Sequence, residues 1–138
     1  MENNSFSEIT EQIKANQSFA IYPHTNMDGD AIGSSAALCL ALRQLGKKAW
    51  IIIDEDVPDN LSFLAEGLVS SDEELARSAD MAFCIDSGAI DRIGKRGVLF
   101  EAAKISACID HHSTSENFCD YAYIDSKSAA TGQLVFLL

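Results

Sequence analysis

The chain has 138 residues, and its 21 acidic and 10 basic side chains give a formal net charge of −11. With 47% hydrophobic residues, a chain of this length can bury about two thirds of its unfolded surface in one domain. The charge argues against wide contacts with a nucleic-acid backbone, but it permits a small anionic substrate beside bound cations. No apolar run approaches the ~20 residues of a membrane span and the start lacks an apolar leader, so we expect a cytoplasmic protein without membrane contacts.

Apolar runs alternate with amphipathic segments along the chain. In chain order, we expect a helix at 5–16, a strand at 18–22, a helix at 31–45, a strand at 49–53, short helices at 60–66 and 71–78, a strand at 81–86, a weakly helical piece at 97–103, strands at 104–110 and 121–125, and a helix from Ser128 onward. Gly46 is the expected stop of the second helix.

The predicted strands are continuously apolar instead of alternating. This pattern is typical of a parallel sheet covered by helices on both faces. We therefore predict a doubly wound α/β fold with a mainly parallel sheet of about five strands. Such sheets bind their ligands beyond the carboxyl ends of the strands.

The four cysteines show no Cys-x-x-Cys spacing. Cys84 and Cys108 lie inside apolar runs. We therefore predict buried, reduced thiols and neither a disulfide nor a zinc site.

All three histidines and several aspartates lie at the carboxyl ends of predicted strands. They are His24, Asp28 and Asp30 after the first strand, Asp86 at the end of the third, and Asp110, His111 and His112 at the end of the fourth. Each has a structural explanation when taken alone. An aspartate such as Asp30 can cap a helix, the Asp-Gly pair at 28–29 can form a turn, and a strand-terminal aspartate is common in loops.

Taken together, these residues indicate a metal centre, because parallel strands bring their carboxyl ends to one edge. Several carboxylates in one crevice would repel one another unless cations lie among them. Imidazoles mixed with carboxylates suit Mn²⁺, Fe²⁺, Zn²⁺ or Co²⁺, and oxygen-rich sets favour Mn²⁺ or Mg²⁺. We expect a two-metal centre with Mn²⁺, a type of centre that hydrolyses phosphate esters or anhydrides by acidifying a water and stabilising phosphoryl oxygens.

The motifs "HTNMDGDAIGSS", "CIDSG" and "CIDHH", in this order, resemble those of the DHH phosphoesterase superfamily. The first motif is most similar to the NrnA-like branch, whose members degrade short oligoribonucleotides and remove the 3′-phosphate of 3′-phosphoadenosine 5′-phosphate (pAp). The resemblance covers about residues 18–138. It implies that His24 and Asp28 bind one Mn²⁺, that Asp30 and His111 bind the other, and that Asp86 bridges the two.

The resemblance also implies roles for four other residues. Asp110 would hold an imidazole by hydrogen bonding, as metal-bound histidines require. His112 would face the substrate phosphate as a hydrogen-bond donor or acid, although a histidine satisfied near the sheet edge explains it too. Asn26 would contact a water or phosphate oxygen, and Arg92 is either a phosphate contact or a surface ion-pair partner.

Members of this superfamily carry two further parts that the 138 residues do not contain. One is a fourth motif with another aspartate ligand of the second metal, and the other is a substrate-gripping domain called DHHA1. The sequence also ends in the apolar "TGQLVFLL". We therefore expect residues 1–138 to be the N-terminal part of a longer enzyme, holding one Mn²⁺ better than the second and turning over weakly or not at all.

The leading hypothesis is a Mn²⁺-dependent phosphoesterase that releases nucleoside monophosphates from short RNA, or AMP and phosphate from pAp. Alternatives in the same class are a cyclic-dinucleotide phosphodiesterase and a pyrophosphatase-like hydrolase. The alternative from another class is a non-catalytic nucleotide- or metal-binding module. The expected partners are short RNA or nucleotides, and a homodimer is one form to test for the full-length protein.

Overall fold

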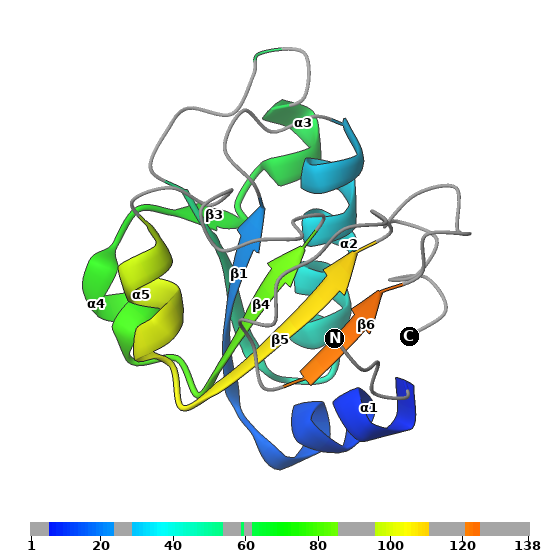
Figure 1. The fold of residues 1–138 in the computed structure, drawn as a ribbon. Coiled ribbons are helices and arrows are strands. Elements are labelled where there is room, and N and C mark those ends of the chain that lie inside the picture. Colours follow the sequence, from blue (N-terminus) through cyan, green and yellow to red (C-terminus); the bar gives the residue numbers. More distant parts are fainter. Residues whose placement is uncertain are drawn as a thin grey trace.

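The computed structural model describes residues 6–23, 29–53, 59, 62–85, 96–110 and 121–124 (Figure 1). These residues form helices and strands in the order α1 (Phe6–Ala15), β1 (Ser18–Pro23), α2 (Gly29–Gln44), β2 (Lys48–Ile52), α3 (Ser62–Ala65), β3 (Val69–Ser70), α4 (Glu73–Arg77), β4 (Met81–Ile85), α5 (Gly97–Ala102), β5 (Ile105–Asp110) and β6 (Tyr121–Ile124).

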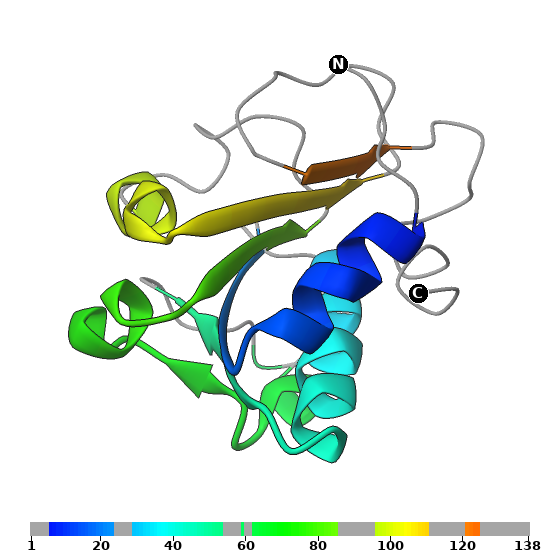
Figure 2. The same cartoon turned by 90° about the horizontal axis from the view of Figure 1, so that it is seen from below.

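The strands form one sheet in the order β3-β2-β1-β4-β5-β6, and every neighbouring pair is parallel. Helices α1 and α2 cover one face of this sheet, and α4 and α5 cover the other (Figure 2). The predicted doubly wound α/β fold is therefore confirmed. The arrangement also explains the continuously apolar strands, because both of their faces are buried.

Alternate residues of β1 contribute to two separate cores. Phe19 and Ile21 lie in a cluster with apolar residues of α1 and α2, whereas Ala20 and Tyr22 lie in a cluster with residues of α4 and α5. This alternation follows from the two-residue period of a strand. The strand end at Pro23 is thus anchored from both faces of the sheet.

Helix α2 connects β1 to β2 and ends at Gln44, two residues before the predicted stop at Gly46. Its buried residues Leu38, Cys39 and Leu42 pack into the core beside β1 and β2. After Gln44 the chain turns at Gly46, which has a φ of 81°, a conformation that glycine adopts without steric penalty. The Gly46 amide donates to the Arg43 carbonyl at 3.0 Å, and the Lys47 amide donates to the Leu42 carbonyl at 3.0 Å.

The predicted strands correspond to β1, β2, β4, β5 and β6, with ends that differ by at most one residue. The sheet also contains β3, which the sequence did not predict and which brings the number of strands to six. The helix predicted from Ser128 lies outside the described residues. Cys39, Cys84 and Cys108 are buried and not joined in disulfides, as expected, and Cys119 lies outside the described residues. No helix in the described segments is long and apolar enough to cross a membrane.

Candidate active site at the carboxyl edge of the sheet

Strands β1, β4 and β5 are neighbours, and they end within one residue of the same level of the sheet. Pro23 pairs with Ile85, and Ile85 pairs with Ile109. Neighbouring strands lie about 4.8 Å apart. The arrowheads of the three strands accordingly lie side by side at one edge (Figure 1).

The structure describes the main chain of two of the predicted site residues. Asp30 is the second residue of α2, and Asp110 is the last residue of β5. The other predicted site residues lie outside the described segments and are His24, Asn26, Asp28, Asp86, Arg92, His111 and His112.

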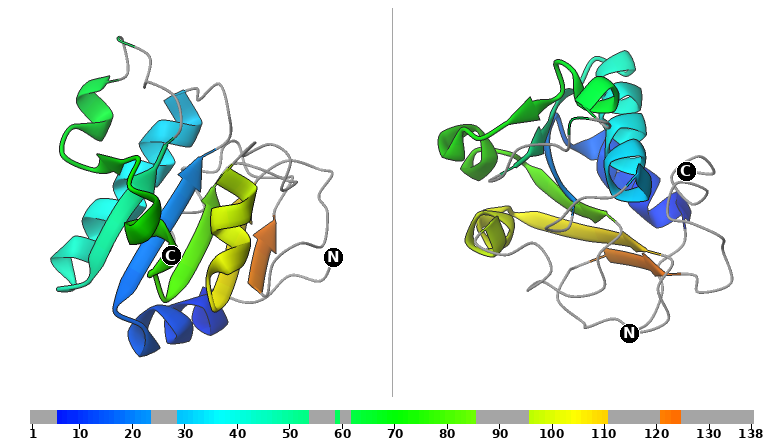
Figure 3. Two further views of the ribbon diagram at one scale, coloured as in Figure 1. Left: turned by 90° about the vertical axis from the view of Figure 1, so that its left-hand side faces the viewer. Right: turned by 90° about the horizontal axis from the view of Figure 1, so that it is seen from above.

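The order of strands and helices at this edge is that of a topological switch point. The chain leaves β1 toward α2 and β2 on one side, and it leaves β4 toward α5 and β5 on the other (Figure 3). The two connections diverge between neighbouring strands β1 and β4, and doubly wound sheets bind ligands in the crevice formed there. In the sequence, the first two predicted motifs follow β1 and β4, the strands on either side of this point, and the third begins within β5, the neighbour of β4.

Connectivity restrains the first motif. Residues 24–28 join the end of β1 to the start of α2. Both neighbours are anchored, because Tyr22 and Ala31 are 0% exposed. Successive Cα atoms are about 3.8 Å apart, so His24 follows directly from a fixed strand end. In the same way, Asp86 follows directly from Ile85 at the end of β4.

The residues that follow the three strand ends in the sequence are of types that suit a hard or borderline divalent cation. The three strand ends lead into histidine and aspartate, which offer nitrogen and oxygen ligands of the kind that Mn²⁺ and related ions bind. Within the segments that the structure describes, no group of three His, Cys, Asp or Glu side chains could hold a metal. Any metal site built from three such side chains in this domain would therefore include at least one side chain outside those segments.

Arg96, directly before α5, is a buried residue at this edge that the sequence did not single out. It is 3% exposed. Its Nη1 donates to the Ile52 carbonyl at 2.7 Å, and its Nη2 donates to the Pro23 carbonyl. Nothing in the local sequence distinguishes Arg96 from Arg92, since each is a cation in a polar stretch before the same helix. In the structure, Arg96 is buried where it bonds to the ends of β1 and β2, which are distant in sequence.

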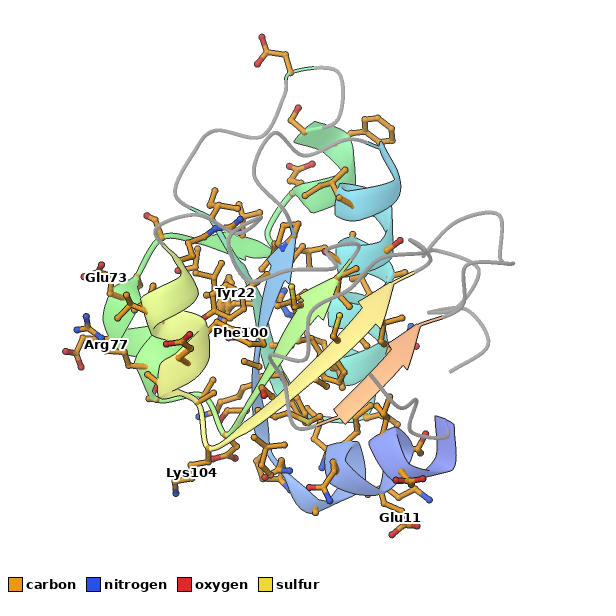
Figure 4. The ribbon with its side chains drawn as sticks, in the orientation of Figure 1. Glu11, Tyr22, Glu73, Arg77, Phe100 and Lys104 are labelled. Carbon is orange, nitrogen blue, oxygen red and sulfur yellow. The ribbon has the colours of Figure 1, made fainter. Side chains whose placement is uncertain are left out.

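Tyr22 lies beneath the same edge and faces α5. Its ring packs edge-on against Phe100 with 5.6 Å between centroids (Figure 4). Its hydroxyl is buried without a hydrogen bond to any residue that the structure describes. Burial raises the pKa of the Tyr22 hydroxyl, and the charge of Arg96 opposes this only in part. Tyr22 therefore stays protonated and neutral at physiological pH.

Comparison with known proteins connects these features to a family. Residues 18–138 match the family model described as "DHH family, N-terminal domain". The chain is 39% identical over 117 residues to the "Bifunctional oligoribonuclease and PAP phosphatase NrnA" of Thermus thermophilus, which covers 83% of this chain and 34% of that protein. It is 24% identical over 131 residues to the "Probable bifunctional oligoribonuclease and PAP phosphatase NrnA" of Streptococcus mutans, covering 95% and 41%.

A solved structure has the same fold. The crystal structure of an exopolyphosphatase-related protein from Bacteroides fragilis superposes with a TM-score of 0.88 and 28% identity, over 95% of this chain and 41% of that one. The chain therefore spans between 34% and 41% of the length of these relatives.

Proposed function

Because the chain belongs to the DHH family, whose N-terminal domain it matches, we propose that the full-length protein carrying this domain is a metal-dependent phosphoesterase. The observation that supports this most is the alignment of β1, β4 and β5, whose ends lead into the three motifs that contain histidine and aspartate. The proposed substrates are short oligoribonucleotides, cut to nucleoside monophosphates, and pAp, converted to AMP and phosphate. The names of the relatives from Thermus and Streptococcus support this choice.

The proposed metal ligands are His24, Asp28, Asp30, Asp86 and His111, with Mn²⁺ as the proposed metal. When bound, the cations would acidify water and offset charge on the phosphoryl oxygens. Bound cations would also reduce the mutual repulsion of the carboxylates gathered at this edge.

The two remaining members of the third motif have different proposed roles. Asp110 ends β5, and its carboxylate would orient an imidazole of the site by hydrogen bonding. His112 would donate a hydrogen bond or a proton to the substrate phosphate. Asn26 and Arg92 are the proposed substrate contacts.

The name of the Bacteroides relative supports a second candidate activity. That protein is called exopolyphosphatase-related, and hydrolysis of a phosphate anhydride needs the same cations and the same in-line geometry. A pyrophosphatase-like or polyphosphatase activity is therefore the alternative to test beside the first.

The deciding experiment assays the full-length protein with Mn²⁺ against pAp, di- to pentaribonucleotides and inorganic polyphosphate. We expect hydrolysis of pAp and the short RNAs, loss of activity in EDTA, and recovery on adding Mn²⁺. Faster hydrolysis of polyphosphate would favour the second candidate. Tight binding of nucleotide and metal without turnover of any of these substrates would instead identify a binding module and overturn the proposal.

The 138-residue chain provides a separate test of metal binding. Mn²⁺ at 100 times its Kd should stabilise a domain that binds it by about 2.7 kcal/mol. We expect a saturable rise in the melting temperature of this chain with Mn²⁺ that EDTA reverses, together with weak or no turnover. If millimolar Mn²⁺ neither binds nor raises the melting temperature, the proposed ligand set fails for this chain.

A further inference from the structure

Arg96 joins the carboxyl ends of two neighbouring strands through one buried guanidinium. Ile52, whose carbonyl accepts from Nη1 at 2.7 Å, is the last residue of β2. Pro23, whose carbonyl accepts from Nη2, is the last residue of β1. A hydrogen bond from a charged donor is roughly twice as strong as one between neutral groups. The planar guanidinium also fixes the directions of both bonds.

These bonds lie where the β1–β2 ladder has stopped. The ladder pairs Ser18 with Lys48 and runs to Ile21 with Ile51, so it ends before Pro23. On its other side, β1 stays paired with β4 as far as Pro23 with Ile85. The end of β1 is therefore held by a ladder on the β4 side and by Arg96 on the β2 side.

We propose that Arg96 is a positioning residue for the first metal-binding motif. Its bond to the Pro23 carbonyl fixes the peptide that leads directly into His24, and its bond to Ile52 ties that peptide to β2. The backbone direction at the start of the motif therefore depends on the side chain of Arg96, which directly precedes α5 and lies 73 residues after Pro23 in the sequence. This inference rests on the proposed function, since it concerns how that metal site is held.

Arg43 provides a matched control at the opposite end of β2. Its Nε donates to the Ala49 carbonyl at 3.0 Å, and its Nη1 donates to the Gly67 carbonyl at 3.0 Å. Its guanidinium also stacks over Trp50, 4.5 Å from the ring centroid. Arg43 thus also donates to two main-chain carbonyls, but Ala49 is near the start of β2 and away from the carboxyl edge.

The experiment compares Arg96→Met, Arg96→Lys and Arg43→Met in the full-length protein. Mn²⁺ affinity is measured by calorimetry, and kcat and KM are measured with pAp at a temperature where circular dichroism shows every variant folded. Loss of partners that orient metal ligands typically weakens metal affinity or activity 10- to 100-fold. We expect about a 10-fold or larger rise in the Mn²⁺ Kd for Arg96→Met. The Mn²⁺ Kd of Arg96→Lys should fall between those of Arg96→Met and the wild type. An ammonium can donate to one of the two carbonyls in good geometry, but it lacks the planar, forked donors of a guanidinium.

The control separates positioning from general stability. Arg43→Met should lower the melting temperature but leave the Mn²⁺ Kd and kcat within about twofold of the wild type, since it disturbs the other end of the strand. If Arg96→Met binds Mn²⁺ as tightly as the wild type, or if Arg43→Met weakens binding equally, the proposal is overturned. If Arg96→Met does not fold, Arg96→Lys decides: a Kd unchanged from the wild type overturns the proposal, and a Kd raised about threefold or more supports it.

Failure of this inference is distinct from failure of the proposed function. If the wild-type protein neither binds Mn²⁺ nor hydrolyses any tested phosphate ester, the proposed function is overturned. If the wild type binds Mn²⁺ and hydrolyses a phosphate ester, and the Arg96 variants do so equally well, only the proposed role of Arg96 is overturned.

Discussion

We expect the two edges of the sheet to use aspartate in opposite ways. At the amino edge, Asp80 precedes β4, and its Oδ2 accepts from the Gln17 amide at 3.1 Å and from the Ser18 amide at 3.3 Å. The Asp80 amide in turn donates to the Ser18 hydroxyl at 2.9 Å. The starts of β1 and β4 are therefore joined by a carboxylate that the backbone itself satisfies. At the carboxyl edge, Asp86 follows the same strand β4.

The difference follows from the direction of the chain in a parallel sheet. The start of a strand can leave amide N–H groups outside the ladder, as at Gln17 and Ser18, and a carboxylate placed there accepts from them. The end of a strand can leave carbonyl groups outside the ladder, as at Pro23, and a carboxylate placed there meets other acceptors. At the carboxyl edge the suitable partner is a cation, as Arg96 illustrates with Pro23 and Ile52. An aspartate at a strand start therefore indicates structure, and a group of them at strand ends indicates a bound cation.

The largest effect that tests this comparison is expected for Asp86→Asn in the full-length protein. Loss of the proposed bridging carboxylate should lower the Mn²⁺-dependent kcat by about 10³-fold, equivalent to about 4 kcal/mol in the barrier. Without metal, the variant should be as stable as the wild type or more so, because one repelling charge is removed. Steady-state assays and thermal unfolding in EDTA measure the two effects.

Asp80→Asn is the control at the other end of β4 and should keep kcat within about threefold of the wild type. Equal loss of activity in both variants would show that the two edges are not functionally different. Normal activity of Asp86→Asn would show that Asp86 is not a metal ligand of the site.

The next effect is on stability, and it concerns Asp80→Ala. The change removes the acceptor for two backbone amides in a part-buried position. It should lower the free energy of unfolding by about 1–2 kcal/mol, since each such bond contributes about 1 kcal/mol net. Urea unfolding of the 138-residue chain measures this. Asp59→Ala, at an exposed position, should change stability by less than about 0.5 kcal/mol. If the two variants are equally stable, the Asp80 bonds seen here contribute nothing.

The contribution of Asp80 should also depend on pH with a defined sign. Hydrogen bonds from the Gln17 and Ser18 backbone lower the pKa of the Asp80 carboxyl in the folded protein, and the charge of Lys104 acts in the same direction, while partial burial opposes them. A lowered folded pKa gives a stabilisation that is complete above the unfolded value of about 3.9. It is lost as the pH falls through that value toward the folded pKa.

We therefore expect the stability difference between wild type and Asp80→Ala to be constant from about pH 5 to 8 and to shrink below about pH 4. Urea titrations across this range check the trend. A difference that stays the same down to pH 3 would mean that the ionised carboxylate is not its source.

The apolar strands, and the placing of the three motifs at or after strand ends, could be predicted from the sequence because each is continuous in the chain. The metal site that these motifs would form stays a prediction. Strand β3 could not be predicted, since Val69 and Ser70 carry no pattern. They form a strand because they lie beside β2, where the Ile53 amide donates to the Ser70 carbonyl at 3.0 Å. The burial of Arg96 could not be predicted from the sequence either, since Arg96 bonds to Pro23 and Ile52, which are distant in sequence.

The smallest expected effect concerns Tyr22, which lies beneath the carboxyl edge and has a buried hydroxyl without a partner among the described residues. Removing a buried hydroxyl that makes no hydrogen bond should be neutral or stabilising by up to about 1 kcal/mol. Tyr22→Phe should therefore unfold at the same urea concentration as the wild type or a higher one, with an unchanged Mn²⁺ Kd.

Tyr22→Leu is the matched variant, since it also removes the edge-on contact with Phe100 at 5.6 Å. It should destabilise the chain by at least about 1 kcal/mol, because aromatic pairs contribute about 0.5–1.5 kcal/mol beyond the area that they bury. A loss of more than about 1 kcal/mol in Tyr22→Phe would reveal a partner for the hydroxyl. A weaker Mn²⁺ Kd in that variant would place the partner at the carboxyl edge. The Tyr22 hydroxyl would then belong to the same hydrogen-bond network as the metal site. The carboxyl edge would in that case differ from the amino edge, where Asp80 bonds only to the nearby Gln17 and Ser18, in its neutral groups as well as in its charged ones.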